Sequence, residues 1–342
     1  MKNLPPRRWW FAAMVVFLLA GTSTTCAHAP ANPATPAPPV DSSLARHDFL
    51  YCGEWQTDRP GEHIYLVRGG KVVWSHEIPD KEELGDCTMT STGHVLFVRK
   101  QHGAAEILPD LATGKGGQIT WSYPGAPGTE VHSVQPIGLD KVLVMQNGQP
   151  AKLMLITKAT GEMTVWELPS TKNVHAQYRH VRMTAAGTFM VAHLSMGIVR
   201  EYDRDAKTVL WQFDDARSAW AAVRLKNGNT LVSGNQNGWV REVSPDKKIV
   251  WELTQKDVDF QLYTLQEAMR LANGNTIINY WVPNGLKDKS LWPSTVQVFE
   301  VTPDKKVVWK LQAWKDPSLG PASCTQILDE PGVPEKPGDV QR

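Results

Sequence analysis

The stretch RLKNGNTLVSG (residues 224–234), followed by SPDKKIVWEL (244–253), returns almost unchanged as RLANGNTIIN (270–279) and TPDKKVVWKL (302–311). Each copy contains an Asn-Gly turn and a Pro-Asp turn between apolar segments, and both dipeptides favour tight turns between strands. The first copy therefore predicts four strands, over residues 221–225, 230–233, 239–243 and 249–253. The repeating unit is a small antiparallel sheet that ends near a tryptophan.

A tryptophan marks the end of six such units along the chain. The six are Trp74, Trp121, Trp166, Trp211, Trp251 and Trp309. Their spacings, by subtraction, are 47, 45, 45, 40 and 58 residues, and a period of roughly 40–50 residues is typical of propeller blades. We therefore predict an all-β fold, a six-bladed β-propeller of four-stranded blades. The repeated indoles are expected to pack between blades rather than to contact a ligand.

The first unit lacks its innermost strand. It begins with HDFLYCGE (47–54), which corresponds to the second strand of the later units. The missing strand matches ASCTQIL (322–328), which follows the last repeated tryptophan. We expect this C-terminal strand to complete blade one and close the ring, because closure removes the open edge of a linear array. The propeller is thus predicted to span residues 45–330, with a disordered tail over 331–342.

The N-terminal residues do not resemble a blade. Basic residues precede a short apolar run, which predicts a signal peptide over residues 1–26. Cys26 stands where a bacterial lipoprotein carries its lipidated cysteine, so membrane attachment through a Cys26 lipid and simple cleavage are both open. Residues 27–44 are rich in Ala and Pro and predict a stiff linker. We expect a periplasmic or extracellular protein, with or without the lipid anchor.

The charge balance argues against a polyanionic partner. The chain of 342 residues has 36 Lys and Arg against 35 Asp and Glu, a formal net charge of +1. Such a balance gives no field of one sign that would attract nucleic acid or an anionic membrane. We expect a small-molecule ligand, no nucleic-acid partner, and a monomer, because a closed propeller needs no partner subunit.

Two cysteines are predicted to face each other where the ring closes. In the alignment of units, Cys324 falls on the first strand and Cys52 opposite it on the second. An exported protein can hold a Cys52–Cys324 disulfide there, closing a loop of roughly 270 residues and adding a few kcal/mol of stability in loop-entropy models. Two alternatives stay open: free buried thiols, and pairing that involves Cys87.

The candidate site lies on one face of the ring, where two sets of loops meet. One set enters the innermost strands, and the other joins the second and third strands. His132 (in EVHSVQ) and His175 (in NVHAQY) occupy similar positions, and Glu267 is predicted at the same level. We predict these three as catalytic, because imidazoles and carboxylates serve as general acids and bases. The predicted ligand-binding residues are Asp86, Arg99, Gln146, Asn147, Gln177, Arg179, His180, His193, Trp220, Gln266 and Trp281.

Structural roles are the alternatives for these residues. A channel histidine can simply form hydrogen bonds with backbone groups and water. Glu267 can form a salt bridge with Arg179 or Arg99. The tryptophans can pack between blades instead of stacking on a sugar ring. No metal site is predicted, because neither His-x-x-x-His nor Cys-x-x-Cys spacing occurs and ligands would have to converge from distant segments. The chain also lacks a phosphate-binding glycine loop, a nucleophile elbow and a calcium loop.

The units TGKGGQITW (113–121), TGEMTVW (160–166) and SPDKKIVW (244–251) resemble the quinoprotein-type repeats of PQQ-like β-propellers. RLKNGNTLVSG resembles units of arylsulfate sulfotransferase-like propellers and of exported β-propeller domain proteins. PQQ dehydrogenases have eight blades, a longer chain and an adjacent cysteine pair, so we predict no bound PQQ and no other cofactor. The sulfotransferase resemblance implies a channel histidine that carries the sulfuryl group, a role open to His132, His175 or His180.

Three hypotheses for function follow. The first is an exported PQQ-like propeller that binds a small polar ligand, such as a carbohydrate, at one mouth of its channel, with catalysis left open. The second is a histidine-dependent transferase of the arylsulfotransferase type. The third is a non-catalytic envelope scaffold or protein-interaction propeller.

Overall fold

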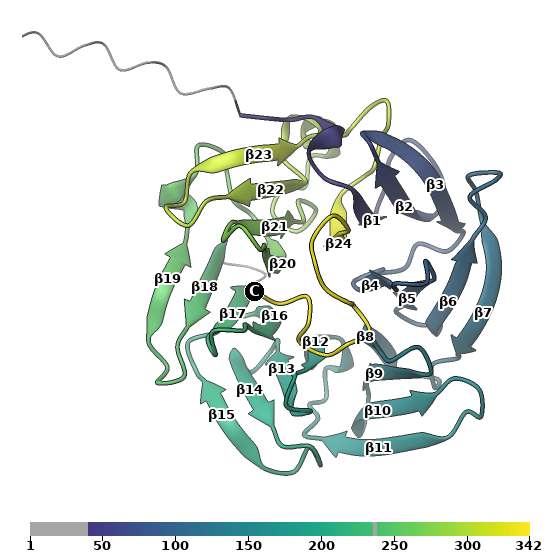
Figure 1. Cartoon of the computed structure of the whole chain (residues 1–342), viewed down its shortest axis with the longest axis vertical. Helices are drawn as coiled ribbons and strands as arrows, with labels where there is room; N and C mark the ends of the chain where they lie inside the picture. Colours follow the sequence, from purple (N-terminus) through teal and green to yellow (C-terminus); the bar gives the residue numbers. More distant parts are fainter. Residues whose placement is uncertain (1–39, 235–237) are drawn as a thin grey trace, which may run out of the picture. The chain divides into compact units, whose positions relative to one another are not determined.

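The computed structural model describes residues 40–234 and 238–342, so the predicted signal peptide, Cys26 and most of the predicted linker lie outside it. Six four-stranded antiparallel sheets form a ring in the described chain (Figure 1), which confirms the predicted six-bladed propeller. No helix among the described residues is long and apolar enough to cross a membrane. The helical elements are short 3₁₀ segments: η1 (Leu44–Arg46), η2 (Val174–Ala176), η3 (Gln255–Asp257) and η4 (Lys289–Ser294).

Each blade runs from an inner strand at the channel to an outer strand at the rim. Blade one contains β24 (Ala322–Ile327), β1 (Phe49–Gly53), β2 (Glu62–Arg68) and β3 (Lys71–Ile78). Blade two contains β4 (Cys87–Met89), β5 (Val95–Arg99), β6 (Gly103–Pro109) and β7 (Gly117–Tyr123). Blade three contains β8 (Glu130–Ile137), β9 (Lys141–Asn147), β10 (Ala151–Thr157) and β11 (Met163–Leu168).

The remaining three blades repeat this order. Blade four contains β12 (Tyr178–Met183), β13 (Phe189–His193), β14 (Ile198–Tyr202) and β15 (Val209–Phe213). Blade five contains β16 (Ala219–Arg224), β17 (Thr230–Gly234), β18 (Trp239–Val243) and β19 (Ile249–Leu253). Blade six contains β20 (Leu265–Arg270), β21 (Thr276–Tyr280), β22 (Val298–Val301) and β23 (Val307–Leu311).

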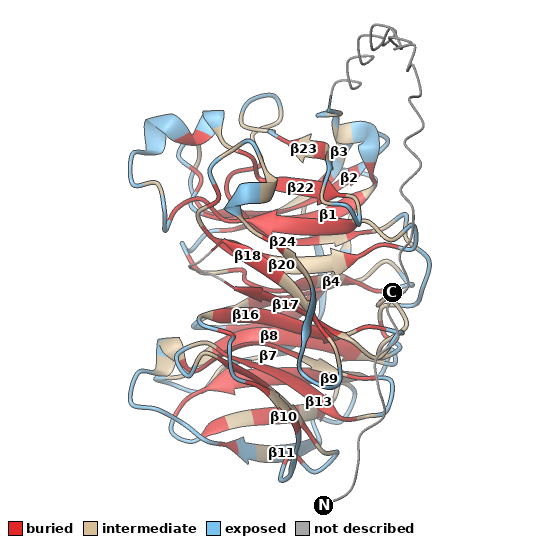
Figure 2. Cartoon of the chain, turned by 90° about the vertical axis from the view of Figure 1, so that its left-hand side faces the viewer, coloured by how far each residue is buried: buried red, intermediate tan, exposed pale blue. Residues whose placement is uncertain are grey.

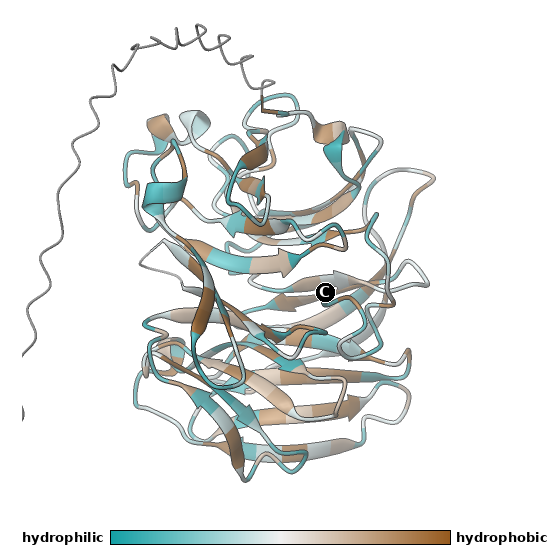
Figure 3. Ribbon diagram, turned by 60° about the vertical axis from the view of Figure 1, so that its left-hand side comes forward, coloured by the Kyte–Doolittle hydropathy of each residue, from teal (hydrophilic) through white to brown (hydrophobic). Residues whose placement is uncertain are grey.

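The repeated turn residues fix the hairpins as their chemistry predicts. Gly228 and Gly274 both have φ of 88°, a left-handed conformation that glycine adopts without steric cost. Central strands such as β17 are buried along their whole length, whereas the rim strand β11 is mostly exposed (Figure 2). Hydrophobic residues concentrate on the strands, while many loops are hydrophilic (Figure 3).

The repeated tryptophans join neighbouring blades. Each of four indole N–H groups donates a hydrogen bond to a backbone carbonyl beyond its own blade. The donor–acceptor pairs are Trp74 to Gly116 (2.6 Å), Trp211 to Pro245 (3.0 Å), Trp251 to Pro303 (2.8 Å) and Trp309 to Ser43 (2.9 Å). A buried indole needs such a partner, so the repeated Trp serves both the packing and the polar part of the blade interface. The hydrogen bond from Trp309 to Ser43 also shows that residues just before blade one help to join blade six to blade one.

The C-terminal strand closes the ring as predicted. β24 pairs antiparallel with β1, and Cys324 lies directly opposite Cys52. The buried side chains of Phe49 and Ile327 share a hydrophobic cluster with Trp309 of the preceding blade. Burying each large apolar side chain stabilises the fold by about 1.5–3 kcal/mol. Closure therefore depends on packing as well as on the strand pairing.

Three free thiols, rather than a disulfide, lie where blade one meets blade two at the point of ring closure. Cys52, Cys87 and Cys324 are free and buried, so the predicted Cys52–Cys324 bond is not formed in this structure although the predicted register is present. The Sγ atom of Cys324 lies 3.5 Å from Sγ of Cys87 on β4 of the next blade. Burial raises the pKa of Cys52 and Cys87, which keeps both as protonated thiols.

Residues 331–342, which we predicted to be disordered, cross the middle of the ring in this structure (Figure 1). Glu335 anchors this C-terminal segment, because its side chain accepts a hydrogen bond from the Ser91 backbone N–H at 3.1 Å and its carbonyl accepts one from Gly138 N–H at 2.8 Å. Beneath the segment lies an inner cavity of about 290 Å³, lined among others by Arg182, Glu267 and Cys324. The tail is thus an ordered cover over one end of the channel.

Candidate functional site

A larger cavity, which we call the mouth cavity, lies on the face of the predicted site. Its volume is about 790 Å³. Five of the predicted site residues line it: His175, Arg179, Trp220, Gln266 and Trp281. Glu54 and Glu83 also line it, and sequence reasoning did not single them out. The mouth cavity therefore gathers imidazole, guanidinium, carboxyl, amide and indole groups from several blades.

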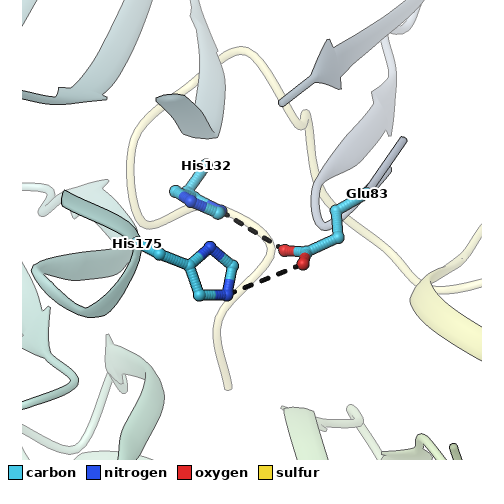
Figure 4. Close-up of side chains that lie close together, drawn as sticks. All are labelled: Glu83, His132 and His175. Carbon is cyan, nitrogen blue, oxygen red and sulfur yellow. Dashed lines mark ion pairs between the residues drawn. The ribbon is translucent and has the colours of Figure 1, made fainter. Parts of the chain in front are cut away.

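Two histidines share one carboxylate at the edge of this cavity. Glu130 Oε2 lies 2.8 Å from His132 Nε2 and 2.8 Å from His175 Nδ1. The imidazole rings are 5.5 Å apart between centroids. On their other side the two rings face Glu83, as Figure 4 shows: His132 Nδ1 is 3.8 Å and His175 Nε2 is 3.7 Å from its carboxylate oxygens. We call these four residues the histidine cluster.

Hydrogen-bond accounting fixes the tautomers of both histidines. Glu130 is an acceptor, so His132 donates from Nε2 and His175 donates from Nδ1. Arg179 can only donate, and its Nη2 lies 3.2 Å from His175 Nε2, so that nitrogen carries a lone pair. Burial lowers the pKa of His132 to about 4, with Arg179 adding to the effect, so its Nδ1 also carries a lone pair at neutral pH.

The charges around the cluster set the ionisation of its carboxylates. Burial opposes ionisation of Glu130, yet its hydrogen bonds with the two histidines bring its pKa well below the usual value. Burial likewise opposes ionisation of Glu83, but His132, Arg179 and Lys100 together hold its pKa below normal. Both carboxylates are therefore ionised at neutral pH and can hold a cation or position an imidazole.

Glu54 behaves in the opposite way. Its carboxyl is fully buried and accepts a hydrogen bond from the Leu84 backbone N–H. Burial, and then the nearby charge of Glu83, raise its pKa well above the usual value. Glu54 therefore retains its proton more readily than an exposed carboxyl does.

Several polar atoms of the mouth residues are buried and have no hydrogen-bond partner among the described residues. They are Arg179 Nε, Trp220 Nε1, Gln266 Oε1 and Trp281 Nε1. The Arg179 guanidinium also lies over the Trp220 ring, 4.9 Å from its centroid, and burial lowers its pKa to about 10. Buried polar groups in folded proteins nearly always find a partner. Four of these unpartnered atoms therefore lie on residues that line one cavity.

The structure separates Glu267 from the predicted catalytic histidines. Glu267 lines the inner cavity, and its Oε1 lies 2.8 Å from His180 Nδ1. Nε2 of His180 contacts the Gly85 carbonyl at 2.7 Å. Both ring nitrogens thus face oxygen atoms, and Arg182 Nη2 also lies 3.3 Å from Nδ1. The predicted trio of His132, His175 and Glu267 is incorrect in this respect, and Glu83 takes the carboxylate position beside the two histidines.

Asp86, predicted to bind ligand, is fully buried in an ion pair instead. Arg182 reaches both of its oxygens, from Nη1 at 2.8 Å and Nη2 at 2.9 Å. Asp86 also accepts hydrogen bonds from Val134 N–H at 2.9 Å and Ser133 Oγ at 3.0 Å. With all these partners, Asp86 links the inner parts of blades two, three and four.

Four other predicted ligand-binding residues also have structural partners. Arg99 pairs with Asp80 at 3.1 Å on the outer surface, and Gln146 accepts a hydrogen bond from Tyr123 at 2.7 Å. Asn147 donates to the Tyr178 carbonyl at 3.1 Å, and Gln177 exchanges two 2.9 Å hydrogen bonds with Gly148. Asn147 and Gln177 thus bond to backbone groups between blades three and four, while Gln146 also accepts from the Ala126 N–H, which leaves all three few groups for a ligand.

His193 does not line the mouth cavity either, although Leu194 and Ser195, which follow it, do. It packs between the rings of Tyr178, 4.7 Å away, and Tyr202, 6.0 Å away, and is fully buried. Burial, with a smaller effect of Arg200, lowers its pKa to about 3.

The folded pKa of His193 lies below its usual value of 6.5, so the unfolded chain binds this proton more readily and acid favours unfolding. We expect this residue to cost about 2–3 kcal/mol of stability between pH 6.5 and about pH 4.5, and more towards pH 3. Urea unfolding at both pH values should show a shallower pH dependence for His193→Gln than for the natural chain. Equal slopes would show that the pKa of His193 is the same in the folded and unfolded protein.

Comparisons with known proteins support the fold. No protein-family model matches the sequence, and no curated protein is significantly similar to it. A protein of unknown function from Bacteroides caccae is similar over 83% of this chain and 99% of its own, with 21% identity and a TM-score of 0.70.

Two further propellers are more distant. A catalytically inactive virginiamycin B lyase from Staphylococcus aureus, solved with quinupristin, matches 78% of this chain and 85% of its own at 11% identity and a TM-score of 0.52. BamB from Moraxella catarrhalis covers 64% of this chain and 61% of its own at 14% identity, and its TM-score of 0.42 is too low to carry an argument. At these identities the likeness concerns the fold alone. The resemblance to arylsulfate sulfotransferases gains no support from these structures.

Proposed function

We propose that this propeller binds a small polar ligand of the carbohydrate class in the mouth cavity. The observation that carries the proposal is the set of unpartnered polar atoms on Arg179, Trp220, Gln266 and Trp281, all of which line that cavity. A buried polar group without a partner costs about 1–3 kcal/mol. A ligand that pairs with these groups would recover much of that cost.

The character of the four atoms indicates the chemistry of the ligand. Three are N–H donors and one is a carbonyl acceptor, so the ligand should offer many acceptor oxygens and at least one hydroxyl. Trp55 is exposed at the cavity and contacts Trp281 edge-on, with ring centroids 6.1 Å apart. Its left-handed backbone, with φ of 57°, is rare for a bulky residue and is typical of functional sites. An exposed indole beside polar groups suits the apolar face of a sugar ring.

Substitution of single indoles by phenyl rings tests the proposal. Trp220→Phe and Trp281→Phe keep an aromatic ring but remove one N–H donor each, so we expect each to weaken binding by roughly 3- to 10-fold. The probes are neutral and uronic-acid-containing oligosaccharides, screened on a glycan array and measured by calorimetry. Trp251→Phe is the matched control, because its N–H donates to Pro303 at 2.8 Å outside the cavity.

The outcomes separate the hypotheses for function. If no saccharide is retained, or if the Trp251→Phe control loses as much affinity as the cavity variants, the carbohydrate proposal is wrong. Capture of an envelope protein that survives Trp220→Phe would instead support a scaffold. Acid-labile modification of His132, His175 or His180 by an aryl sulfate would support the transferase. We also propose export to the periplasm or the cell exterior, which fractionation of the native host would test.

A further inference from the structure

Beyond ligand binding, we propose that Glu83, His132 and His175 bind one divalent transition-metal ion, with Zn²⁺ as the leading candidate. The three side chains offer His132 Nδ1, His175 Nε2 and a Glu83 oxygen, and these atoms all lie within 4.8 Å of one another (Figure 4). The expectation of no metal site rested on the lack of local spacing motifs, but these ligands come from three different blades.

The distances are close to those a metal requires. Ligands bonded to one tetrahedral Zn²⁺ at about 2.0–2.2 Å lie roughly 3.3–3.6 Å from one another. The nitrogen-to-oxygen distances here are 3.8 Å from His132 Nδ1 to Glu83 Oε2 and 3.7 Å from His175 Nε2 to Glu83 Oε1, so each histidine faces a different oxygen of the carboxylate. Small side-chain movements would therefore bring these atoms to bonding distance. Two His and one Glu are also a known ligand set of catalytic zinc, which leaves a fourth position open.

Glu130 orients the two histidines for this role. Histidine ligands of metals usually donate their other ring N–H to a carboxylate or carbonyl, which fixes the tautomer and increases basicity. Here one Glu130 oxygen accepts from both rings at 2.8 Å, on the side away from Glu83. The two remaining ring nitrogens, His132 Nδ1 and His175 Nε2, are the ones that face Glu83.

Two cations compete for the same atoms. Arg179 Nη2 lies 3.2 Å from His175 Nε2, and Lys100 Nζ lies 3.3 Å from Glu83 Oε1. A metal ion must displace the Arg179 contact, so the guanidinium lowers metal affinity. After displacement, Arg179 would remain beside the open coordination position, where it could contact an oxygen of a bound ligand.

Other acidic and histidine clusters of the described chain are less suitable. In the group formed by Asp86, His180 and Glu267, the Arg182 guanidinium already pairs with Asp86 through two hydrogen bonds. In the group formed by Asp80, Glu82 and His102, the Asp80 and His102 side chains are about half exposed and Arg99 pairs with Asp80.

Calorimetric titration of the metal-free full chain with Zn²⁺, together with the visible spectrum of the Co²⁺ form, tests the proposal. We expect one ion per chain and a tetrahedral or five-coordinate Co²⁺ spectrum. Glu83→Gln and His175→Gln should lower Zn²⁺ affinity by at least about 100-fold, and Glu130→Gln by about 10- to 100-fold. Arg179→Met should raise it. His102→Gln is the matched control and should leave it unchanged.

His175 is half-exposed, so its substitution should leave the fold intact, and circular dichroism of each variant checks this. The proposal is overturned if the natural chain binds no Zn²⁺, or if Glu83→Gln and His175→Gln bind it as tightly as the natural chain does. The readout involves no saccharide, and Trp220→Phe and Trp281→Phe should retain the metal. Failure of the metal proposal is therefore distinguishable from failure of the carbohydrate proposal.

Discussion

Removal of residues 321–342 should leave the chain largely unfolded, whereas removal of residues 331–342 alone should leave a folded propeller. The longer deletion takes away β24, which pairs with β1 along its length. It exposes the edge of β1 and the buried side chains of Phe49 and Leu50. Losing a whole strand from a core of this kind costs an amount comparable to the total stability of a domain, about 5–15 kcal/mol.

The shorter deletion is the control for loss of the C terminus. It removes the contacts of Glu335 with Ser91 and Gly138, which lie on loops rather than in the strand core. We expect a cooperative thermal transition, a few degrees lower, and greater access of thiol reagents to Cys87 and Cys324. Circular dichroism and size-exclusion chromatography of both truncated chains make the comparison. A natural-like transition after the longer deletion would show that β24 is not needed for closure.

The propeller fold could be predicted from the sequence because the same turn and tryptophan motifs recur in each blade. The Asn-Gly turns and the Trp at the end of each unit fix the strands, and the lack of an inner strand before residue 47 pointed to residues 322–328. The cysteine register followed from the same alignment and holds, since Cys52 lies opposite Cys324. The free state of the thiols was not predictable, because the approach of Cys87 from the next blade depends on how blades pack.

The candidate site was less predictable, and the inner strands show why. Their pairing shifts register near their first residues, between Val131 and Ser133, Tyr178 and Val181, Ala219 and Ala221, and Leu265 and Ala268. A bulge of this kind changes the direction of every side chain before it relative to a regular strand. Counting along aligned units therefore placed Glu267 at the mouth, although it faces the inner cavity.

Glu83 was missed for a related reason. It lies in the irregular segment between β3 and β4, where no repeated position exists to align. The signal available was the pair Glu82-Glu83 a few residues before an inner strand. In the structure Glu83 faces His132 at the start of β8 and His175 in η2. Arg182 was missed because it sits within a strand whose pattern looks structural. Its importance comes from Asp86, which is distant in sequence.

Arg182→Met should lower the free energy of unfolding by about 3–5 kcal/mol, the cost of leaving one partner of a buried ion pair alone. Asp86 is fully buried, and Arg182 pairs with both of its oxygens. Although burial opposes ionisation, Arg182 keeps the pKa of Asp86 below its usual value. Without the guanidinium, Asp86 must either remain as an isolated buried charge or take up a proton.

The double variant Arg182→Met/Asp86→Asn separates two contributions to the loss of stability. One is the lost attraction between the two side chains, and the other is the cost of an isolated buried charge on Asp86. Removing both charges leaves no isolated ion, so we expect the double variant to be more stable than Arg182→Met alone in urea unfolding. Arg241→Met is the matched control, because Arg241 is as buried as Arg182 but pairs with the exposed carboxylates of Glu252 at 2.7 Å and Asp215 at 3.1 Å. Its removal strands no buried carboxylate, so we expect a smaller loss of stability than for Arg182→Met.

The size of the Arg182 effect decides how the inner channel should be understood. Suppose that the single variant loses much stability and that the double variant regains part of it. Asp86 then serves to hold three blades together, and the mouth cavity remains the candidate site for ligand binding. A loss no greater than that of Arg241→Met would mean that Asp86 tolerates the missing partner. In that case Glu267, which lines the inner cavity, would be the residue to test for contact with a ligand beneath the C-terminal segment.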